Sequence, residues 1–306
     1  MITYYYRDIK NKRLKKPKKL LPGSWIHVVK PSEENLKFLV DELNLEEGHV
    51  KDALDMYEVP RLEIEGKYIY IYTRFPYGEG DNINTAPILL VVTPKFFITI
   101  SPIETKFLDF FITGKTKFCT TQKTKLLLQF LLHINKSYNY FLHKISRKIR
   151  SIKVKLEKIK NKNIVQFVSF EGIVNDFRPT LVRTNAILNA LLQGKHLALH
   201  ENDKDLVEDI VLSNRQLIET ADDSIRTIVN IREAYTTIMT NNLNRVIKLL
   251  TSVTVILTIP TMIASIYGMN VSLPYADRGW AFVAIILIML LVTGLLLLTF
   301  IREDFL

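Results

Sequence analysis

The sequence predicts an α+β membrane protein in which a water-soluble N-terminal part precedes two membrane-spanning helices. Of its 306 residues, 24% are charged and 48% are hydrophobic, so the chain must contain both a hydrated part and a strongly apolar part. Two runs lack Asp, Glu, Lys, Arg and His: Leu249 to Ala276, and the 22 residues from Trp280 to Ile301. As a helix, the second run would be about 33 Å long, which suffices to cross the hydrocarbon core of a bilayer. It is apolar on every face, which argues against a buried helical hairpin in a globular core.

Residues 1–120 predict a cytosolic α/β domain. Six short runs rich in β-branched and aromatic residues alternate with turn signals. ITYYYR and SWIHVV come first, then RLEIE and YIYIYTRF flank Gly66-Lys67, and PILLVV and FFITIS flank Thr93-Pro94-Lys95. Ser32, followed by two glutamates, predicts the start of a helix that continues through LKFLVDELNL. The glycine-containing stretch YGEGDN, residues 77–82, is expected to be a loop.

Helices follow this domain. We expect a cytosolic helical hairpin over 121–202, a stalk helix that continues into the first transmembrane helix over 203–268, and a second transmembrane helix over 280–301. The stalk would be about 100 Å long, so it would run from the cytosol into the bilayer. Residues 144–162 carry nine Lys or Arg against one Glu and no aromatic residue. A helix surface facing solvent or phosphate is therefore expected there, and no nucleic-acid partner.

The basic residues predict how the chain is oriented. Of the 41 Lys and Arg, 38 lie in residues 1–245; Arg245 and Lys248 precede the first apolar run, and Arg302 follows the second. The positive-inside tendency then places both termini in the cytoplasm, in a multi-pass protein of the cell (plasma or inner) membrane. The lone Cys119 cannot form an intrachain disulfide and suits a reducing compartment.

A stripe of hydroxyl side chains marks the first apolar run. Its members recur at steps of 3, 4, 3 and 4 and so share one helix face: Thr251, Thr254, Thr258, Thr261 and Ser265. The same alternation reaches back to Ile247, Asn244 and Glu233. The hydroxyls could bond back to carbonyls of their own helix or join neighbouring helices, or they could line a hydrated pore. The continuation through Asn244 and out to Asn270 favours the pore, and a chain with two spans can enclose one only as several copies.

The segment Tyr267-Gly268-Met269-Asn270, at the end of the first of two C-terminal spans, resembles the signature of the CorA magnesium-transporter family. The context agrees: NNLNRVIKLLT precedes the helix, and a short loop and a second apolar helix follow. The resemblance implies a funnel-shaped homopentamer, not an enzyme, that imports hydrated Mg²⁺ down its electrochemical gradient. It also implies gating by intracellular Mg²⁺, which would be both transported and regulatory, and no organic cofactor.

The resemblance also implies roles for individual residues. Gly268, Met269 and Asn270 would form the selectivity filter, with Gly268 letting the helix end. The pore-lining residues would be Asn244, Ile247, Leu250, Thr251, Thr254, Thr258, Thr261 and Ser265. The metal-contacting residues would be Asn270, Thr261, an acidic stalk position at Glu233 and a regulatory site between subunits at Asp209. Mg²⁺ gives up its water reluctantly, so carboxamide and hydroxyl oxygens suit contacts to a hydrated ion, whereas the soft thioether of Met269 suits packing.

Some features depart from the family or leave alternatives open. The chain ends IREDFL, where relatives often carry a lysine cluster, and the basic stretch 144–162 is the candidate replacement. The partner of Asp209 is open, with Glu79 and Asp81 as candidates, and Asp277 would add a sparse acidic ring outside. The alternatives are a ZntB-like zinc transporter, or a Co²⁺ or Ni²⁺ transporter, of the same superfamily. From another class, a membrane-anchored sensor or scaffold without transport also fits.

Overall fold

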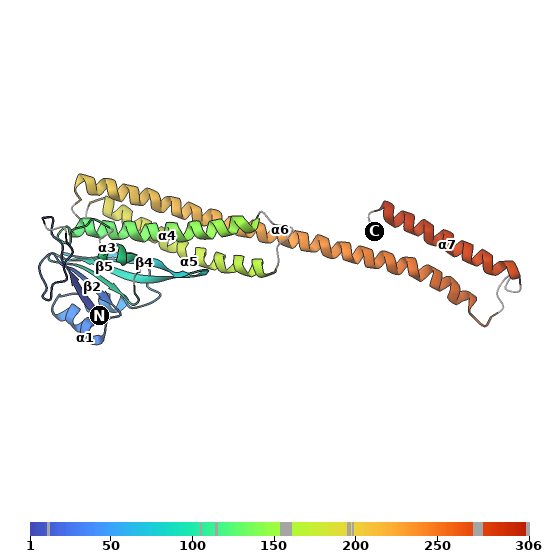
Figure 1. Ribbon diagram of the computed structural model, residues 1–306, viewed down its shortest axis with the longest axis horizontal. Coiled ribbons are helices and arrows are strands. Elements are labelled where there is room, and N and C mark those ends of the chain that lie inside the picture. The colour runs from blue at the N-terminus through green and yellow to red at the C-terminus, as the bar shows by residue number, and fades with distance from the viewer. Residues whose placement is uncertain are drawn as a thin grey trace. The chain divides into compact units, whose positions relative to one another are not determined.

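The computed structural model consists of two compact units, Met1–Asn230 and Ile231–Leu306, and each is described by itself (Figure 1). Most of the chain is described, with short gaps, and all ranges below refer to that part. The described residues are 1–10, 13–104, 106–113, 116–153, 161–194, 197, 199–271 and 278–303.

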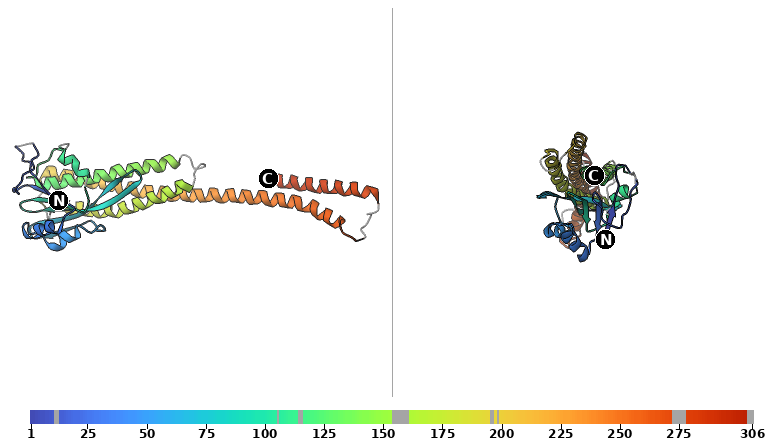
Figure 2. Two further views of the ribbon diagram at one scale, coloured as in Figure 1. Left: turned by 60° about the horizontal axis from the view of Figure 1, so that its bottom comes forward. Right: turned by 90° about the vertical axis from the view of Figure 1, so that its left-hand side faces the viewer.

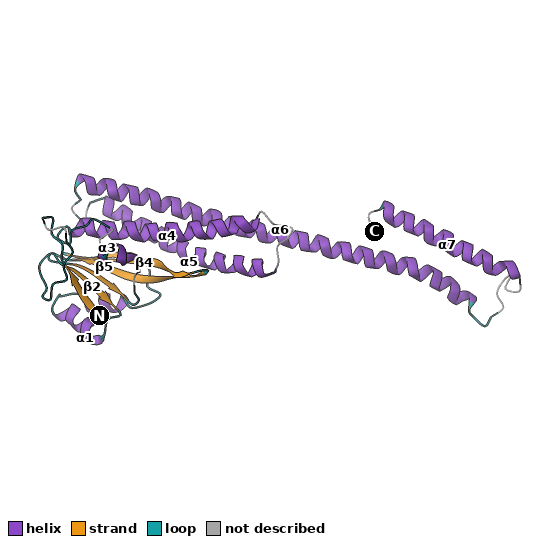
Figure 3. Ribbon diagram, viewed as in Figure 1, coloured by secondary structure: helices purple, strands orange, loops and turns teal. Residues whose placement is uncertain are grey.

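A six-stranded sheet forms the base of the N-terminal unit, in the order β1-β2-β6-β5-β4-β3. The β2–β6 pair is parallel, and the other neighbouring pairs are antiparallel. All six predicted β-rich runs form strands, as Figure 3 shows in orange. The strands are β1 Ile2–Tyr5, β2 Trp25–Val29, β3 Arg61–Glu65, β4 Tyr68–Glu79, β5 Asn82–Val92 and β6 Phe97–Ser101.

The stretch 77–82 corrects the expectation of a loop, because β4 and β5 continue through it to a tight turn at Gly80-Asp81. Gly78 has φ 132°, and a Cβ added there would lie 2.0 Å from the carbonyl oxygen of Asn82 on the opposite strand. Pairing with the neighbouring strand therefore decides the conformation of this segment, and glycine at position 78 is what allows the close approach.

Two short helices cover one face of the sheet. Helix α1, Glu33–Asp41, begins as predicted at Ser32, whose Oγ accepts a hydrogen bond from the Asn35 N–H while the Asn35 side chain accepts from the Ser32 N–H. Helix α2, Glu47–Asp52, was not predicted. Its six residues are too few to show a hydrophobic period, and its N-cap is Glu46 rather than a residue type with strong capping preference.

Long helices cover the other face, so the sheet lies between two helical layers (Figures 1 and 2). The side chains of each strand alternate between the layers: Ile26 joins the core under α1 and α2, whereas its neighbour Trp25 faces the opposite side. Trp25 is fully buried and its ring lies within 6.3 Å of those of Phe111, Phe118 and Phe130. This aromatic cluster ties the sheet to α4.

The helices after the sheet follow the predicted order. A short 3₁₀ turn at Lys106–Leu108 leads into α3, and the helices are α3 Asp109–Ile112, α4 Lys123–Lys153, α5 Asn161–Leu192, α6 Glu201–Tyr267 and α7 Gly279–Arg302. The described residues of the basic stretch 144–162 belong to the end of α4, which is described to Lys153, and to the start of α5 at Asn161; the rest of the stretch lies outside the described residues. Helices α6 and α7 are both long and apolar enough to cross a membrane, as the two uncharged runs predicted.

Candidate ion pathway

The predicted hydroxyl stripe lies on an exposed side of α6. In the C-terminal unit, α7 runs back beside the end of α6 in both views (Figures 1 and 2). The positions of α6 beyond residue 250 that are buried or half-buried recur at helical spacing: Ser252, Val255, Ile256, Ile259, Pro260 and Ile263. None of them belongs to the stripe. All members of the stripe are exposed: Thr251, Thr254, Thr258, Thr261 and Ser265. The face that carries the hydroxyls is thus left open by the helix with which α6 pairs.

The hydroxyl hydrogens bond back to the helix itself. The Oγ1 atoms of Thr254, Thr258 and Thr261 donate to the carbonyl oxygens four residues earlier, at 2.8, 2.7 and 2.7 Å. This is the geometry of the non-pore alternative. A threonine hydroxyl has one hydrogen and two lone pairs, so donating inward leaves the oxygen as an acceptor on the outer side. The stripe therefore offers a row of acceptors, the polarity that suits the water molecules around a cation.

The end of α6 differs from the expectation in one respect. The helix ends at Tyr267, and the N–H groups of Gly268 and Met269 still bond back to Ala264 and Ile266 at 3.0 and 3.2 Å. Gly268 is not in the left-handed region, so the freedom of glycine to adopt a positive φ does not end the helix. A Cβ added at Gly268 would lie 3.4 Å from the nearest atom, the Ala264 carbonyl oxygen. Within one chain there is room for a side chain at this position.

The rest of the predicted filter and constriction is equally exposed. Met269 is 55% exposed, Asn270 is exposed, and Ile247 and Leu250 are 51% and 65% exposed. Asn244 lies on the same open part of α6. Large apolar side chains exposed in a row indicate a surface that is covered by something outside the chain.

The predicted acidic sites lie far apart in the sequence and are each exposed on α6. Glu233 belongs to the C-terminal unit and Asp209 to the N-terminal unit. Of the two candidate partners of Asp209, Asp81 is engaged within the chain: it forms an ion pair with Lys148 and accepts a hydrogen bond from Gln166 at 2.8 Å. The predicted outer ring at Asp277 lies outside the described residues.

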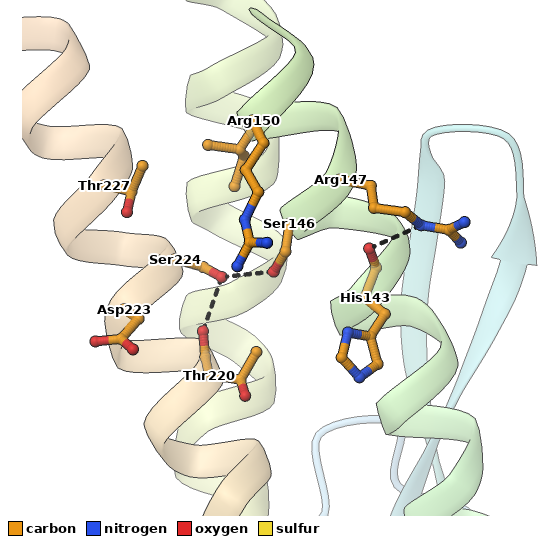
Figure 4. A pocket seen from close by; sticks show the side chains of 9 residues that line it. His143, Ser146, Arg147, Arg150, Thr220, Asp223, Ser224 and Thr227 are labelled. Carbon is orange, nitrogen blue, oxygen red and sulfur yellow. Dashed lines mark hydrogen bonds between the residues drawn. The ribbon is translucent and has the colours of Figure 1, made fainter. Parts of the chain in front are cut away.

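A polar groove of about 230 Å³ lies between α4 and α6 in the N-terminal unit (Figure 4). Ser146 of α4 and Ser224 of α6 bond across it at 3.0 Å, and Ser224 donates to the Thr220 carbonyl oxygen at 2.8 Å. Arg150 projects from α4 beside these hydroxyls, whereas Arg147 points away from them and its Nε donates to the His143 carbonyl oxygen at 3.4 Å. Two basic residues of the stretch 144–162 thus border a helix–helix groove, and no Phe, Tyr or Trp is among the described residues that line it.

One cluster of possible metal ligands was not predicted from the sequence. Glu46, His49 and Glu65 lie together in the α/β layer of the N-terminal unit. The signal was present only in part: Glu46 and His49 are three residues apart, but neither α2 nor the approach of β3 could be foreseen.

An α/β layer, a helical hairpin and one very long helix that ends in the first of two apolar spans define a two-span membrane protein. The chain belongs to the family described as CorA-like Mg²⁺ transporter protein, which matches residues 23–302. The family resemblance drawn from the YGMN segment is thereby confirmed, and the family is one of transporters rather than enzymes.

Individual relatives agree with this assignment. The chain is 24% identical over 291 residues to the protein named cobalt/magnesium transport protein CorA of Methanocaldococcus jannaschii, covering 91% of this chain and 90% of that one. The complete structure of the CorA magnesium transporter of the same organism superposes with a TM-score of 0.87 at 21% identity, covering 100% of this chain and 99% of that one. The cytoplasmic domain of ZntB from Vibrio parahaemolyticus RIMD 2210633 matches with a TM-score of 0.65 at 8% identity, covering 78% and 98%. The two structural matches show a shared fold alone.

Proposed function

We propose that this chain is a passive Mg²⁺ channel or transporter that works as a homopentamer in the cell membrane. The observation that carries the proposal is the open face of α6, where hydroxyl acceptors lead to an exposed carboxamide at Asn270. A single chain leaves this face uncovered, and a ring of copies would turn it toward a common axis. Family membership and the names of the relatives supply the ion.

The driving force would be the membrane potential. A divalent cation that enters a negative compartment gains about 4.6 kcal/mol per 100 mV, which makes a nucleotide unnecessary. Both termini would then face the cytoplasm, as the distribution of Lys and Arg predicts. The hydrated ion would exchange hydrogen bonds with Asn270, Thr261 and the rest of the stripe, and Ile247 and Leu250 would form a constriction that closes by excluding water.

Regulation would come from intracellular Mg²⁺ bound between neighbouring subunits. Asp209 is exposed, so its carboxylate is available to a second copy of the chain. Occupancy would favour the closed state, and loss of the ion would open it. Glu233 would supply a further ring of carboxylates along the stalk.

The test is ion uptake into proteoliposomes that hold the purified protein under an inside-negative potential. We expect Mg²⁺ uptake to fall about tenfold or more in Asn270→Ala, because each copy loses a hydrogen bond that is worth about 1.5 to 3 kcal/mol when made to a charged species. Asn242→Ala is the matched control: it removes the same carboxamide from an exposed position of α6 that does not belong to the stripe, and it should keep the native rate.

Three outcomes contradict the proposal in different ways. Equal uptake by Asn270→Ala and the native chain would remove Asn270 from the ion path. Zn²⁺ or Co²⁺ uptake without Mg²⁺ uptake would assign the chain to another ion. No uptake of any cation by folded oligomers would favour a membrane-anchored sensor or scaffold.

A further inference from the structure

A cluster of ionisable side chains in the N-terminal unit has the composition of a metal site. One ligand atom each from Glu46, His49 and Glu65 lies within 4.8 Å of the others. His49 is 5% exposed, whereas both glutamates are exposed, so the cluster has a buried floor and an entrance from solvent. It belongs to the α/β layer and includes none of the residues assigned to the ion pathway.

Local structure brings these residues together. Glu46 is the N-cap of α2 and accepts a hydrogen bond from the His49 N–H at 3.0 Å, which places its carboxylate beside that residue. The imidazole lies against the ring of Tyr70, with ring centroids 4.1 Å apart and the two planes tilted by 33°. Strand β3 contributes Glu63 and Glu65, which are two residues apart and so point to the same side of the strand.

The hydrogen bonds of Tyr72 determine which nitrogen of the ring carries hydrogen. The Tyr72 hydroxyl donates to the carbonyl oxygen of His49 at 3.1 Å and also lies 2.9 Å from Nδ1. It has a single hydrogen, so both contacts are satisfied only when Nδ1–H donates to the tyrosine oxygen. A neutral His49 therefore presents a bare lone pair at Nε2.

That lone pair faces groups that cannot donate to it. Nε2 lies 3.2 Å from a carboxylate oxygen of Glu65 and 3.6 Å from one of Glu63. The nearby guanidinium of Arg61 is already bonded to three carboxylates, those of Asp52, Glu58 and Glu63. Glu63 already accepts from Arg61, so Nε2 and the Glu65 carboxylate are left as two acceptors 3.2 Å apart. Their contact is favourable only with a positive charge between them, which is either a proton on Nε2 or a bound metal cation.

We propose that Glu46, His49 and Glu65 bind one divalent transition-metal cation of the Zn²⁺, Co²⁺ or Ni²⁺ class. Ligands about 2.1 Å from a common ion at tetrahedral or octahedral angles are about 3.0 to 3.4 Å apart, and the Nε2–Glu65 distance of 3.2 Å fits that range. An imidazole nitrogen selects these metals over Mg²⁺, which prefers oxygen ligands and its own water. The Nδ1–H bond to Tyr72 is the kind of outer contact that orients a ligating histidine.

The test uses the metal-free full-length protein in detergent, titrated with CoCl₂ in a large excess of MgCl₂. Excess Mg²⁺ occupies oxygen-only sites and the ion pathway, so visible Co²⁺ absorption reports a nitrogen-containing site. We expect one Mg²⁺-resistant Co²⁺ per chain, lost in His49→Gln and in Glu65→Gln. Glu42→Gln removes the same charge from an exposed position at the end of α1 and should bind like the native chain. Tyr72→Phe should weaken binding about 10- to 100-fold.

Glu65→Gln separates metal binding from folding. Its amide can donate to Nε2, so the variant should keep the native melting temperature of the apo protein while losing the metal. Absence of Mg²⁺-resistant Co²⁺ from the native chain would overturn the proposal and leave an imidazolium paired with carboxylates. Unchanged binding by both variants would also overturn it. The experiment measures metal binding rather than ion flux, so failure of the metal-site proposal and failure of the proposed transport can be told apart.

Discussion

The two units of this chain differ in whether contacts within the chain explain which residues they contain. In the N-terminal unit such contacts do: Trp25 is enclosed by aromatic rings, and the close approach of Asn82 requires a glycine at position 78. In the C-terminal unit they do not: Leu250 is 65% exposed, and Gly268 has room for a side chain. A residue that its own chain does not explain points to lipid, to other copies or to an ion.

The sharpest form of this contrast is a pair of side-chain truncations, one buried and one exposed. Trp25→Ala should lower the free energy of unfolding of the N-terminal unit by about 3 to 5 kcal/mol, because it leaves a cavity among packed rings. Leu290→Ala truncates a side chain of α7, in the C-terminal unit, that is 65% exposed, so the free energy of unfolding measured for this variant should change by less than about 0.5 kcal/mol. Urea unfolding of the full-length protein in detergent, followed by circular dichroism, measures both. Equal effects would show that the units do not differ in this way.

Acid should affect the two units differently, since residues 231–306 contain no histidine. Burial lowers the pKa of His27 to about 4, and the hydroxyl of Thr99, which accepts from the Trp25 N–H at 3.0 Å, is 2.9 Å from its Nδ1. The folded state thus favours the neutral ring. Stability should be full above about pH 6.5 and should fall by about 3 kcal/mol as the pH drops toward 4.

Unfolding midpoints measured across this pH range test the prediction. His27→Gln cannot titrate, so its stability should depend less on pH over the same range, whatever its stability at neutral pH. A pH dependence that is the same in the native chain and in His27→Gln would assign the acid sensitivity to other groups.

A pair of glycine substitutions tests the same contrast at the backbone. Gly78→Ala places a Cβ 2.0 Å from a carbonyl oxygen at φ 132°, so it should destabilise the N-terminal unit by about 1 to 3 kcal/mol. Gly268→Ala meets nothing nearer than 3.4 Å and should leave the melting temperature unchanged. If copies of the chain meet at this position, Gly268→Ala should instead slow Mg²⁺ uptake. A drop in melting temperature equal to that of Gly78→Ala would show that glycine is needed within one chain.

The same contrast explains how much could be predicted from the sequence. Hydrophobic period and turn residues are local, so the six strands, the cap at Ser32 and both apolar spans were predicted. The turn at Gly80-Asp81 and helix α2 were not, because strand pairing and packing against the sheet decide them. The spacing of the hydroxyls located the stripe, whereas the donation of their hydrogens inward is a property of the folded helix.

The smallest expected effect concerns the stripe itself. Thr258→Val keeps the shape of an exposed side chain but removes its outward acceptor, so stability should change by less than about 0.5 kcal/mol. Mg²⁺ uptake should fall roughly fivefold, the equivalent of about 1 kcal/mol for one lost hydrogen bond. Ser252→Ala is the matched control: this hydroxyl also donates inward, at 2.8 Å, but it is fully buried, away from the stripe, and its loss should leave uptake unchanged. If both variants slowed uptake equally, hydroxyls would matter only for the helix, and the open face would have no special part in conduction.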